Sequence, residues 1–516
     1  MNFSVIHYIL GTVLCFEGVF LLAPTAVAVF YAEKAGFYYI GAALACFFAG
    51  ALLRLRHPKS KVFYSREGFL AVTFSWIILS MAGAAPMYLT GEYTSYVDAL
   101  FDTISGFTTT GASVLSSVEE LSRATAFWRC FTHWSGGMGV LVFIMAILPL
   151  SGSSNMHLMR AESPGPSVGK LVPKVRQTAL ILYKIYLVIT VVQVVLLMLA
   201  GLTLYEALTL SFSTVGTGGF ALLNSSIASY NWAVQVIIII FMLLCALNFN
   251  TYYLLLIRRP KEALLQNAEV KWFLGIVFAS AAVIAVDIRH GFSGIAEAFH
   301  TSLFQVATLV SSTGFATADF NLWPEFSKTI LVLLMFMGAC AGSTGGGFKV
   351  SRLMIVVRAA RNELLTMMHP RSVQQVQING RRVPDNVVKT ALCYMTVYVL
   401  IVLGSVLLVS IDDFDMTTNF TAVLATMNNI GPGLGVVGPT GNFGRFSVFS
   451  KFVLMCDMLI GRLELFPVLA LFAPGVWRLP ARRSRKELQK MDEMEEAEET
   501  GTGSKGWTKR RKQEKL

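Results

Sequence analysis

The chain has 516 residues, of which 54% are hydrophobic and only 14% are charged, whereas roughly 25% of the residues in a typical soluble domain are charged. This composition excludes a soluble globular domain and indicates a polytopic membrane protein. Seven cysteines in a chain of this length do not make a disulfide framework. The net charge of +11 does not by itself indicate nucleic-acid binding, because the basic residues lie between and after apolar stretches.

Ten apolar stretches reach the length of about 20 residues that a helix needs to cross a bilayer. They are residues 5–30, 35–54, 67–89, 127–150, 179–201, 231–257, 271–290, 327–356, 388–410 and 447–473. The first is too long, and too lightly charged at its start, for a cleavable signal peptide, so we expect it to be retained. Glu17 within it is costly in lipid, and we expect its side chain to face protein or a polar cavity.

Lysine and arginine gather in four connectors between these stretches. The connectors are residues 54–61, the segment with Arg160, Lys170, Lys174 and Arg176, residues 258–261, and residues 352–389. By the positive-inside rule they are cytoplasmic, which predicts a multi-pass protein of the cell inner membrane, in contact with its lipids, with both termini in the cytoplasm. The mixed-charge tail, residues 478–516, is expected to be solvated there.

Four connectors on the opposite side each hold a semi-polar segment of about 15–20 residues, too short to span and therefore expected to be re-entrant. The segments are FDTISGFTTTGAS (101–113), SFSTVGTGGF (211–220), LFQVATLVSSTGFATADF (303–320) and FTAVLATMNNIGPGLG (420–435). Each reads as a short apolar helix, then hydroxyl or amide residues, then a glycine. The aligned glycines are Gly111, Gly218, Gly314 and Gly431. A single segment could be explained by helix packing, but four recurrences favour a repeated unit.

Such a unit has a specific chemistry. A re-entrant helix directs its C-terminal end, with about half a negative charge, to the membrane centre. Backbone carbonyls of the following strand can replace a hydration shell, and glycine lets the backbone turn them toward an axis. The predicted ion-binding residues are Thr109, Thr110, Gly111, Gly216, Thr217, Gly218, Ser312, Thr313, Gly314, Asn429, Ile430 and Gly431. They include no carboxylate, which favours a monovalent cation.

Three acids, Asp102, Glu206 and Glu297, are expected near the outer starts of the short helices. An acid at a helix N-terminus stabilises the helix, and it can also attract cations. Both explanations stay open for these residues, with helix capping at least as good as attraction.

With these segments, HWSGGMGVLVF (133–143), GACAGSTGGGFKVSR (338–352) and DMLIGRLELFPVLALF (457–472) resemble the potassium transporter superfamily that includes TrkH and KtrB. The resemblance covers about residues 67–473, and the N-terminal helix pair is more like TrkH. It implies an all-α fold in which four pseudo-symmetric helix–pore-helix–helix repeats surround one K⁺ pore. It also implies K⁺-selective filter glycines, a homodimer, and a cytosolic nucleotide-binding ring of the TrkA or KtrA type. K⁺ is the expected bound ion, without an organic cofactor or nucleic acid.

The expected organisation places the four pore repeats between an N-terminal extension and the charged tail. The extension is residues 1–60, the repeats are residues 61–178, 179–262, 263–380 and 381–477, and the tail is residues 478–516.

Two features suggest a gate. Residues 338–349 contain five glycines and cannot sustain a regular helix. The resemblance implies an intramembrane loop below the filter, and a kink without a gating role is the alternative. It also implies that Arg462 faces the permeation path, with Glu464 and Lys349 as candidate partners and a structural Arg–Glu pair as the alternative. The predicted gating residues are Gly342, Gly345, Gly346, Gly347, Lys349, Arg462 and Glu464.

Channel-like K⁺ uptake is therefore the expected function. A Na⁺- or H⁺-coupled symporter that uses the same filter is the alternative. A transporter of another solute with inverted halves is disfavoured, because the four repeats share one orientation. An intramembrane serine protease built on GFSG (291–294) with His290 and His300 fails, because this motif lies in an outside connector. A Walker A loop fails because Phe348 follows Gly347 where lysine is required.

Overall fold

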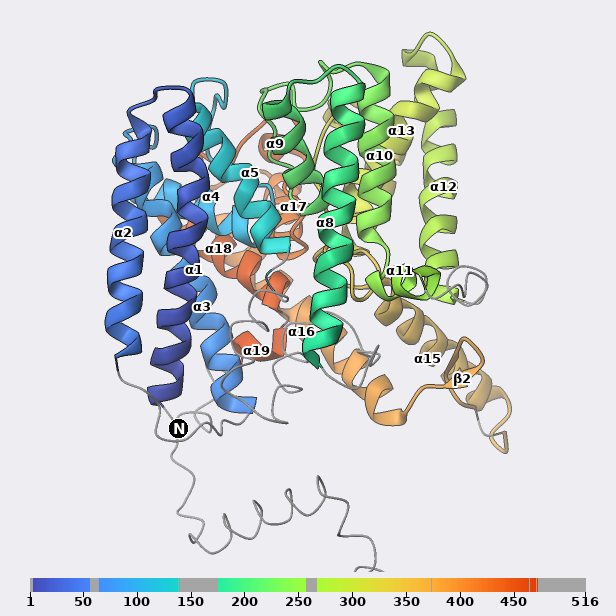
Figure 1. The fold of residues 1–516 in the computed structure, drawn as a ribbon. Coiled ribbons are helices and arrows are strands. Elements are labelled where there is room, and N and C mark those ends of the chain that lie inside the picture. Colours follow the sequence, from blue (N-terminus) through green and yellow to red (C-terminus); the bar gives the residue numbers. More distant parts are fainter. Residues whose placement is uncertain are drawn as a thin grey trace, which may run out of the picture. The chain divides into compact units, whose positions relative to one another are not determined.

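The computed structural model describes residues 3–55, 65–137, 139, 175–256, 267–372, 374–463, 465–469 and 471. The chain divides into one unit of residues 2–470 and a second unit of residue 1 with residues 471–516. Of the second unit only Leu471 is described, so the fold below is that of the first unit. The regular secondary structure in the described part of this unit is helical apart from one two-stranded hairpin (Figure 1).

Six helices within the described ranges are long and apolar enough to cross a membrane. They are α1 (Phe3–Phe30), α2 (Ala35–Arg54), α3 (Ser65–Leu89), α8 (Val175–Leu199), α12 (Ala268–Ile288) and α16 (Asp385–Val409). The chain is therefore a membrane protein, as its composition indicated.

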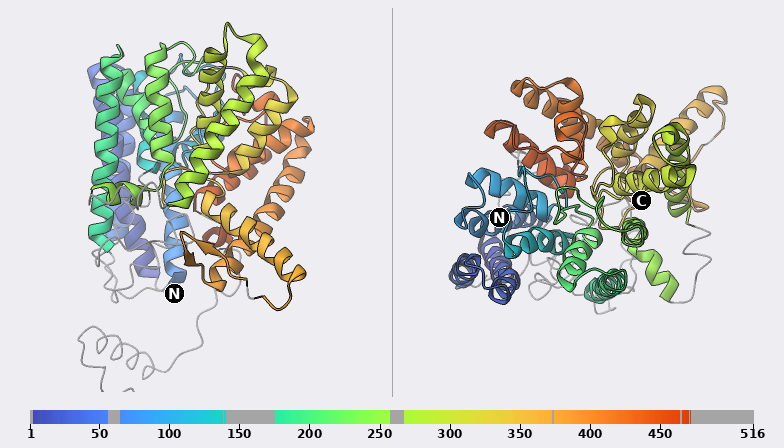
Figure 2. Two further views of the ribbon diagram at one scale, coloured as in Figure 1. Left: turned by 90° about the vertical axis from the view of Figure 1, so that its right-hand side faces the viewer. Right: turned by 90° about the horizontal axis from the view of Figure 1, so that it is seen from above.

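Four short helices take the places of the four predicted re-entrant segments. They are α4 (Tyr96–Phe107), α9 (Leu204–Val215), α13 (Ile295–Val310) and α17 (Met416–Met427). Each is followed by a further helix, namely α5 (Arg123–Gly137), α10 (Trp232–Ala246), α14 (Glu325–Phe336) and α18 (Val448–Leu463). Seen from above, the units α3–α4–α5, α8–α9–α10, α12–α13–α14 and α16–α17–α18 surround a common centre (Figure 2). The all-α fold with four repeats and an N-terminal helix pair is confirmed.

Local signals determine where the short helices begin. Ser95, Thr203 and Asp415 each accept a hydrogen bond from the backbone N–H three residues later and so cap the first turn. In α9, Glu206 completes a capping box with Thr203. The remaining short helix, α13, begins after Gly294, which has no side chain to supply a cap.

Two predicted spans are wrong in detail, because the helix breaks within each. Residues 231–257 divide into α10 and α11 (Phe249–Leu256), and residues 327–356 divide into α14 and α15 (Val350–Met368). Residues 337–349 join α14 to α15, and we call them the central loop.

The central loop enters the break between α10 and α11. The N–H of Cys340 donates to the carbonyl oxygen of Ala246, and the N–H of Phe249 donates to that of Gly342, both at 3.0 Å. Each interruption therefore satisfies backbone groups that the other leaves without a helical partner. The break is a consequence of this tertiary contact, which the apolar sequence of residues 231–257 does not reveal.

The remaining elements are short. They are η2 (Arg289–Gly291), η3 (Phe320–Leu322), η4 (Ser410–Asp412), η5 (Gly435–Val437), α19 (Leu465–Leu469) and the antiparallel strands β1 (Gln377–Ile378) and β2 (Arg381–Arg382). Most of the predicted connectors at residues 54–61, 160–176 and 258–261 lies outside the described residues. So does the second half of the predicted span 127–150, apart from residue 139.

The N-terminal pair packs closely on itself and on the first repeat. A Cβ atom built on Gly11 would lie 2.7 Å from the carbonyl oxygen of Gly50, so glycine permits the approach of α1 and α2. Glu17 of α1 is fully buried and faces α3, where a Cβ built on Gly83 would lie 3.0 Å from its Oε1. Its carboxyl group thus faces protein, as the sequence predicted.

Candidate ion pathway

The chain after each short helix folds back on the helix end in the same way in all four repeats. A backbone N–H donates to the carbonyl oxygen five residues earlier in the helix, at 2.8 Å in each case. The donor and acceptor pairs are Thr110 and Ser105, Gly218 and Ser213, Thr313 and Thr308, and Ile430 and Ala425. These bonds define equivalent positions in the four repeats.

The backbone is left-handed at two positions in each of these turns. At the first position φ lies between +52° and +56°, and the residues are Thr109, Thr217, Ser312 and Asn429. At the second, two residues later, φ lies between +80° and +96°, and the residues are Gly111, Gly219, Gly314 and Gly431. We call residues 109–111, 217–219, 312–314 and 429–431 the ring segments.

The predicted alignment through Gly218 is therefore wrong by one residue, and Gly219 is the counterpart of Gly111. The sequence GTGGF offers two adjacent glycines, and only the backbone conformation shows which of them is left-handed. Gly216, also predicted as a site residue, is the C-cap of α9 and precedes its ring segment.

The ring segments meet in a closed cycle. A Cβ atom built on the left-handed glycine of each repeat would meet a backbone carbonyl oxygen of another repeat, and the fourth contact returns to the first repeat. The pairs are Gly111 with Gly218, Gly219 with Thr313, Gly314 with Ile430, and Gly431 with Thr110. A side chain fits at none of these four positions, and the positive φ also favours glycine.

The chemistry of the cycle is that of backbone oxygens. The ring segments contain no acidic side chain, and their hydroxyl and amide residues are buried. The four short helices end at the cycle, and each C-terminal end carries about half a negative charge. Carbonyl oxygens in such a field suit a monovalent cation that has lost its hydration shell.

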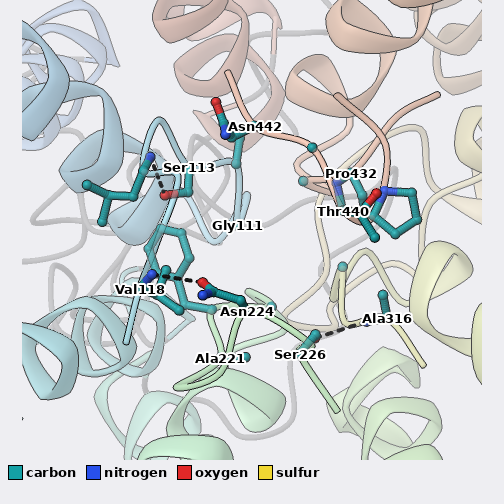
Figure 3. Close-up of a pocket in the computed structure, with 18 of the residues that line it drawn as sticks. Gly111, Ser113, Val118, Ala221, Asn224, Ser226, Ala316, Pro432, Thr440 and Asn442 are labelled. Carbon is teal, nitrogen blue, oxygen red and sulfur yellow. Dashed lines mark hydrogen bonds between the residues drawn. The ribbon is translucent and has the colours of Figure 1, made fainter. Parts of the chain in front are cut away.

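A cavity of about 160 Å³ lies against the glycine ends of the ring segments, and we call it the vestibule. It is lined by all four left-handed glycines and by residues that follow them, including Ser113, Asn224 and Thr440 (Figure 3). Arg129 is the one charged residue in this described lining. The approach to the cycle is therefore polar and, apart from Arg129, uncharged.

Hydrogen bonds join the four connectors around the vestibule in a second cycle. Two of the pairs are Val118 with Asn224 at 2.9 Å and Ala316 with Ser226 at 3.1 Å (Figure 3). The other two are Gly435 with Asn321 at 2.9 Å and Phe443 with Ser113 at 2.8 Å. In each pair the first residue donates from its backbone N–H. The connectors link repeats 1 to 2, 2 to 3, 3 to 4 and 4 to 1, so they hold the four ring segments at fixed separations.

Asp102 is not near the start of its helix, contrary to expectation. It is the seventh residue of α4, is buried, and forms an ion pair with Arg129 of α5 at 3.1 Å. Its Oδ2 also accepts hydrogen bonds from Tyr93 and Ser113, both at 2.9 Å. Asp102 therefore anchors the chain that follows the first ring segment, and its charge is directed at Arg129.

The other acids at the short helices do lie in first turns or at caps. Glu206 bonds to Thr203 in the capping box, and Glu297 accepts a hydrogen bond from the backbone N–H of Ser293 at 3.1 Å. Hydrogen bonds from Thr418 lower the pKa of the capping residue Asp415. Capping accounts for these contacts without a cation.

The central loop contacts the first residues of the third and fourth ring segments, at the end opposite the vestibule. The N–H of Gly346 donates to the hydroxyl of Ser312 at 2.8 Å, and that of Phe348 donates to Asn428 Oδ1 at 3.4 Å. A Cβ atom built on Gly346 would lie 2.6 Å from Asn429 Oδ1. Gly345 and Gly346 thus lie directly against the cycle, where a larger residue would displace the chain, whereas the predicted gating glycine Gly342 lies at the break between α10 and α11.

Arg462 of α18 connects the central loop to the first repeat. Its guanidinium donates to Thr109 Oγ1 at 3.2 Å, to the carbonyl oxygen of Thr344 at 2.7 Å, and to the carbonyl oxygen of Gly136 at 2.6 Å. One cation therefore joins a ring segment, the central loop and the end of α5. Two of these three acceptors are backbone carbonyls, which leave no signature in a sequence.

The three acceptors of Arg462 given above include neither of the partners expected from the sequence, Lys349 and Glu464. Lys349, buried at the start of α15, donates to the carbonyl oxygens of Gly345 and Gly346 within the central loop. Glu464 lies outside the described residues. Asn248 lies in the break beside Gly342, where a Cβ atom built on Gly342 would be 3.1 Å from Asn248 Oδ1.

Two contacts at the cycle were missed by the sequence reasoning, although Asn429 itself was predicted as an ion-binding residue. Asn429 Nδ2 donates to Thr110 Oγ1 and to the carbonyl oxygen of Met458, both at 2.9 Å, and so joins the fourth segment to the first. His133 of α5 packs behind the second segment, against Gly218. The adjacent amides of the fourth segment were a signal for the first contact, whereas nothing in the sequence pairs His133 with Gly218.

Comparisons with known proteins agree with this architecture. A family model described as TrkH, cation transport protein, matches residues 37–478. The Trk system potassium uptake protein TrkH of Vibrio parahaemolyticus is 36% identical over 93% of this chain and 100% of its own length, and that of Escherichia coli K12 is 34% identical with the same coverage. A crystal structure of the potassium transporter TrkH from Vibrio parahaemolyticus matches with a TM-score of 0.84 at 33% identity, over 93% of this chain and 100% of that chain.

Proposed function

The chain belongs to the TrkH family of cation transport proteins, and we propose that it takes up K⁺ through the cycle of ring segments in a channel-like manner. One observation carries the proposal: four left-handed glycines from four repeats, each turned toward a carbonyl oxygen of another repeat. A closed set of backbone oxygens can replace the hydration shell of a monovalent cation. The relatives named as potassium uptake proteins support K⁺ as that cation.

In this proposal the K⁺ ligands are backbone oxygens of the ring segments. The contributing residues are Thr109, Thr110, Gly111, Thr217, Gly218, Gly219, Ser312, Thr313, Gly314, Asn429, Ile430 and Gly431. The proposal keeps the predicted set except for Gly216, which Gly219 replaces. The vestibule then admits the ion from outside the cell, and the central loop lies below the filter on the cytoplasmic side.

The central loop and Arg462 form the gate in this proposal. The loop lies against two ring segments, and Arg462 holds it to a third through Thr109. A positive charge at this point also opposes a passing cation. Flux requires that the loop, including Gly342, Gly345, Gly346 and Gly347, leave its position.

The names of the relatives also bear on the assembly. The Trk relatives are named as parts of a system, which supports further components beside this chain. We propose a homodimer in the cell inner membrane, with both termini cytoplasmic and a cytosolic nucleotide-binding ring of the TrkA or KtrA type that moves the central loop. The repeat boundaries at residues 61, 179, 263 and 381 are kept as part of this proposal.

A direct test measures ion flux in liposomes that contain only this protein. K⁺ flux should follow the K⁺ gradient, and Gly219→Ser should reduce the ratio of K⁺ to Na⁺ permeability by about tenfold, because a side chain would displace the neighbouring carbonyl. Gly91→Ser is the matched control, since Gly91 has a φ of +80° but no atom near its Cβ position. Unchanged selectivity in the Gly219 variant would refute the filter. Flux that requires a Na⁺ or H⁺ gradient would favour the symporter.

A further inference from the structure

We propose that the His133 imidazole takes the place of side chains that the second ring segment lacks. It is thereby a positioning residue for discrimination of K⁺ over Na⁺. This inference rests on the proposed filter function of the ring segments. It concerns one position at which the second repeat departs from the other three.

In the first and third repeats a pair of hydroxyls supports the ring segment from behind. Thr108 Oγ1 and Thr110 Oγ1 are 2.7 Å apart, and Ser311 Oγ and Thr313 Oγ1 are also 2.7 Å apart. In each pair one residue is the C-cap of the short helix and the other is the middle residue of the ring segment. The pair therefore fastens the ring segment to the end of its helix.

The second repeat has no such pair, because both positions are glycine. Gly216 is the C-cap of α9, and Gly218 is the middle residue of the ring segment. In the fourth repeat the same two positions hold Asn428 and Ile430, so side chains are present there as well. The second repeat alone lacks side chains at both positions.

His133 occupies the space that these two side chains would fill. A Cβ atom built on Gly218 would overlap the Cγ, Nδ1 and Cδ2 atoms of the His133 ring. One built on Gly216 would overlap the His133 carbonyl group. A residue of α5, in the first repeat, thus supplies in space what the second repeat lacks in sequence.

The imidazole is held firmly in this place. Its Nδ1 is 3.0 Å from Ser213 Oγ in α9, and its ring stacks on Phe220, with ring centres 4.3 Å apart and an angle of 23° between the planes. The Arg129 guanidinium lies over the same Phe220 ring, 4.0 Å from its centre. His133 is fully buried and does not line the vestibule, so it acts on the ring segment and not on the ion directly.

The physical consequence concerns the carbonyl oxygens of residues 217–219. Two adjacent glycines have wide conformational freedom, so this ring segment is the most deformable of the four unless it is confined. Discrimination between two monovalent cations depends on the number and position of the oxygens that replace the hydration shell. The imidazole confines the segment from behind and keeps its oxygens in the cycle.

The test is a compensating pair of substitutions. His133→Ala should lower the ratio of K⁺ to Na⁺ permeability by about tenfold while K⁺ flux stays within about threefold of the wild type. Gly218→Thr alone should impair folding, because threonine would overlap the imidazole. The double variant His133→Ala/Gly218→Thr should restore selectivity to within about twofold, since the threonine copies the first and third repeats. The readouts are bilayer reversal potentials and the melting temperature in detergent.

The outcomes separate this inference from the proposed function. If Gly219→Ser lowers selectivity but His133→Ala does not, the filter stands and the role of His133 is wrong. If neither changes selectivity, the filter itself fails. A double variant that folds no better than Gly218→Thr would also overturn the inference, because the two side chains would then not share one space. His133→Asn, which keeps a polar group toward Ser213 with less ring volume, should fall between His133→Ala and the wild type in selectivity.

Discussion

The guanidinium of Arg462 donates a 2.7 Å hydrogen bond to the carbonyl oxygen of Thr344, which joins the last described long helix to the middle of the central loop. The same guanidinium nitrogen donates to Thr109 Oγ1 in the first ring segment. The central loop is thus held from above by the ring segments and from the side by one arginine. This contact makes the arginine a restraint on the loop as well as a positive charge near the path.

We expect Arg462→Ala to raise basal K⁺ flux. Hydrogen bonds from a charged donor contribute about 1.5–3 kcal/mol each, and 1.4 kcal/mol is a factor of ten in an equilibrium, so the open fraction should rise by about tenfold or more. The measurement is K⁺ flux into liposomes without any partner protein. Arg381→Ala, at an exposed arginine of the hairpin, is the control for loss of a charge. Unchanged flux at unchanged melting temperature would show that Arg462 does not restrain the loop.

We expect Gly346→Ala to displace the central loop, because the new methyl group would lie 2.6 Å from Asn429 Oδ1. Cys340 in the same loop is a free, fully buried thiol and reports the displacement. Maleimide labelling of Cys340 should become at least about tenfold faster, because labelling follows the population in which the loop is open.

The labelling experiment needs a background in which the exposed Cys393 and Cys456 are replaced by serine. Gly404→Ala is the matched control, since Gly404 lies in helix α16 with no atom near its Cβ position and should leave labelling unchanged. Slow labelling in both variants would contradict the close packing of the loop against the fourth ring segment.

The repeated architecture could be predicted because the pattern of a re-entrant segment between two spanning stretches occurs four times in the sequence. No single segment was decisive, yet helix, hydroxyl or amide residues and glycine recur between spanning stretches. The register within a segment could not be predicted in the same way. In GTGGF the choice between Gly218 and Gly219 depends on which residue adopts a positive φ, and glycine permits either.

The tertiary contacts explain the other differences. The helix break after Ala246 coincides with its hydrogen bonds to the central loop, nearly a hundred residues later in the chain. The sequence of α10 and α11 contains no proline or glycine that would predict this break. Asp102 was expected at a helix start, but its burial and its partner Arg129 depend on how α4 faces α5. Arg462 donates to the backbone carbonyls of Thr344 and Gly136, and residue types could not predict these two contacts.

We expect the Asp102–Arg129 pair to be costly to break from one side. Both side chains are almost completely buried, with 0% and 3% of their surfaces exposed. Arg129→Met leaves a buried carboxylate without its cation and should destabilise the fold by about 3–5 kcal/mol. The double variant Asp102→Asn/Arg129→Met removes both charges and should lose clearly less stability than Arg129→Met. Melting temperatures of Arg129→Met, Asp102→Asn and the double variant test this, and additive losses would show that the pair is not coupled.

We expect the cap of α17 to respond to acid through Asp415. Thr418 donates to this carboxylate from both its hydroxyl and its backbone N–H, and these bonds lower the pKa of Asp415. Because the pKa is lower in the folded protein, the charged cap stabilises the fold above the unfolded pKa of about 3.9, and this contribution is lost as the pH falls through the folded value. Asp415→Asn keeps a capping side chain but does not titrate.

The wild type should therefore lose stability relative to Asp415→Asn below about pH 4, with a constant difference between about pH 5 and pH 8. Asp415→Ala should cost about 1 kcal/mol at neutral pH, because the first turn of α17 loses its cap. Hydrogen exchange at the Thr418 amide and melting temperatures over this pH range are the measurements. Parallel acid sensitivity of the wild type and Asp415→Asn would show that the carboxylate does not stabilise the start of α17, and hence that the position of the fourth ring segment does not depend on its charge.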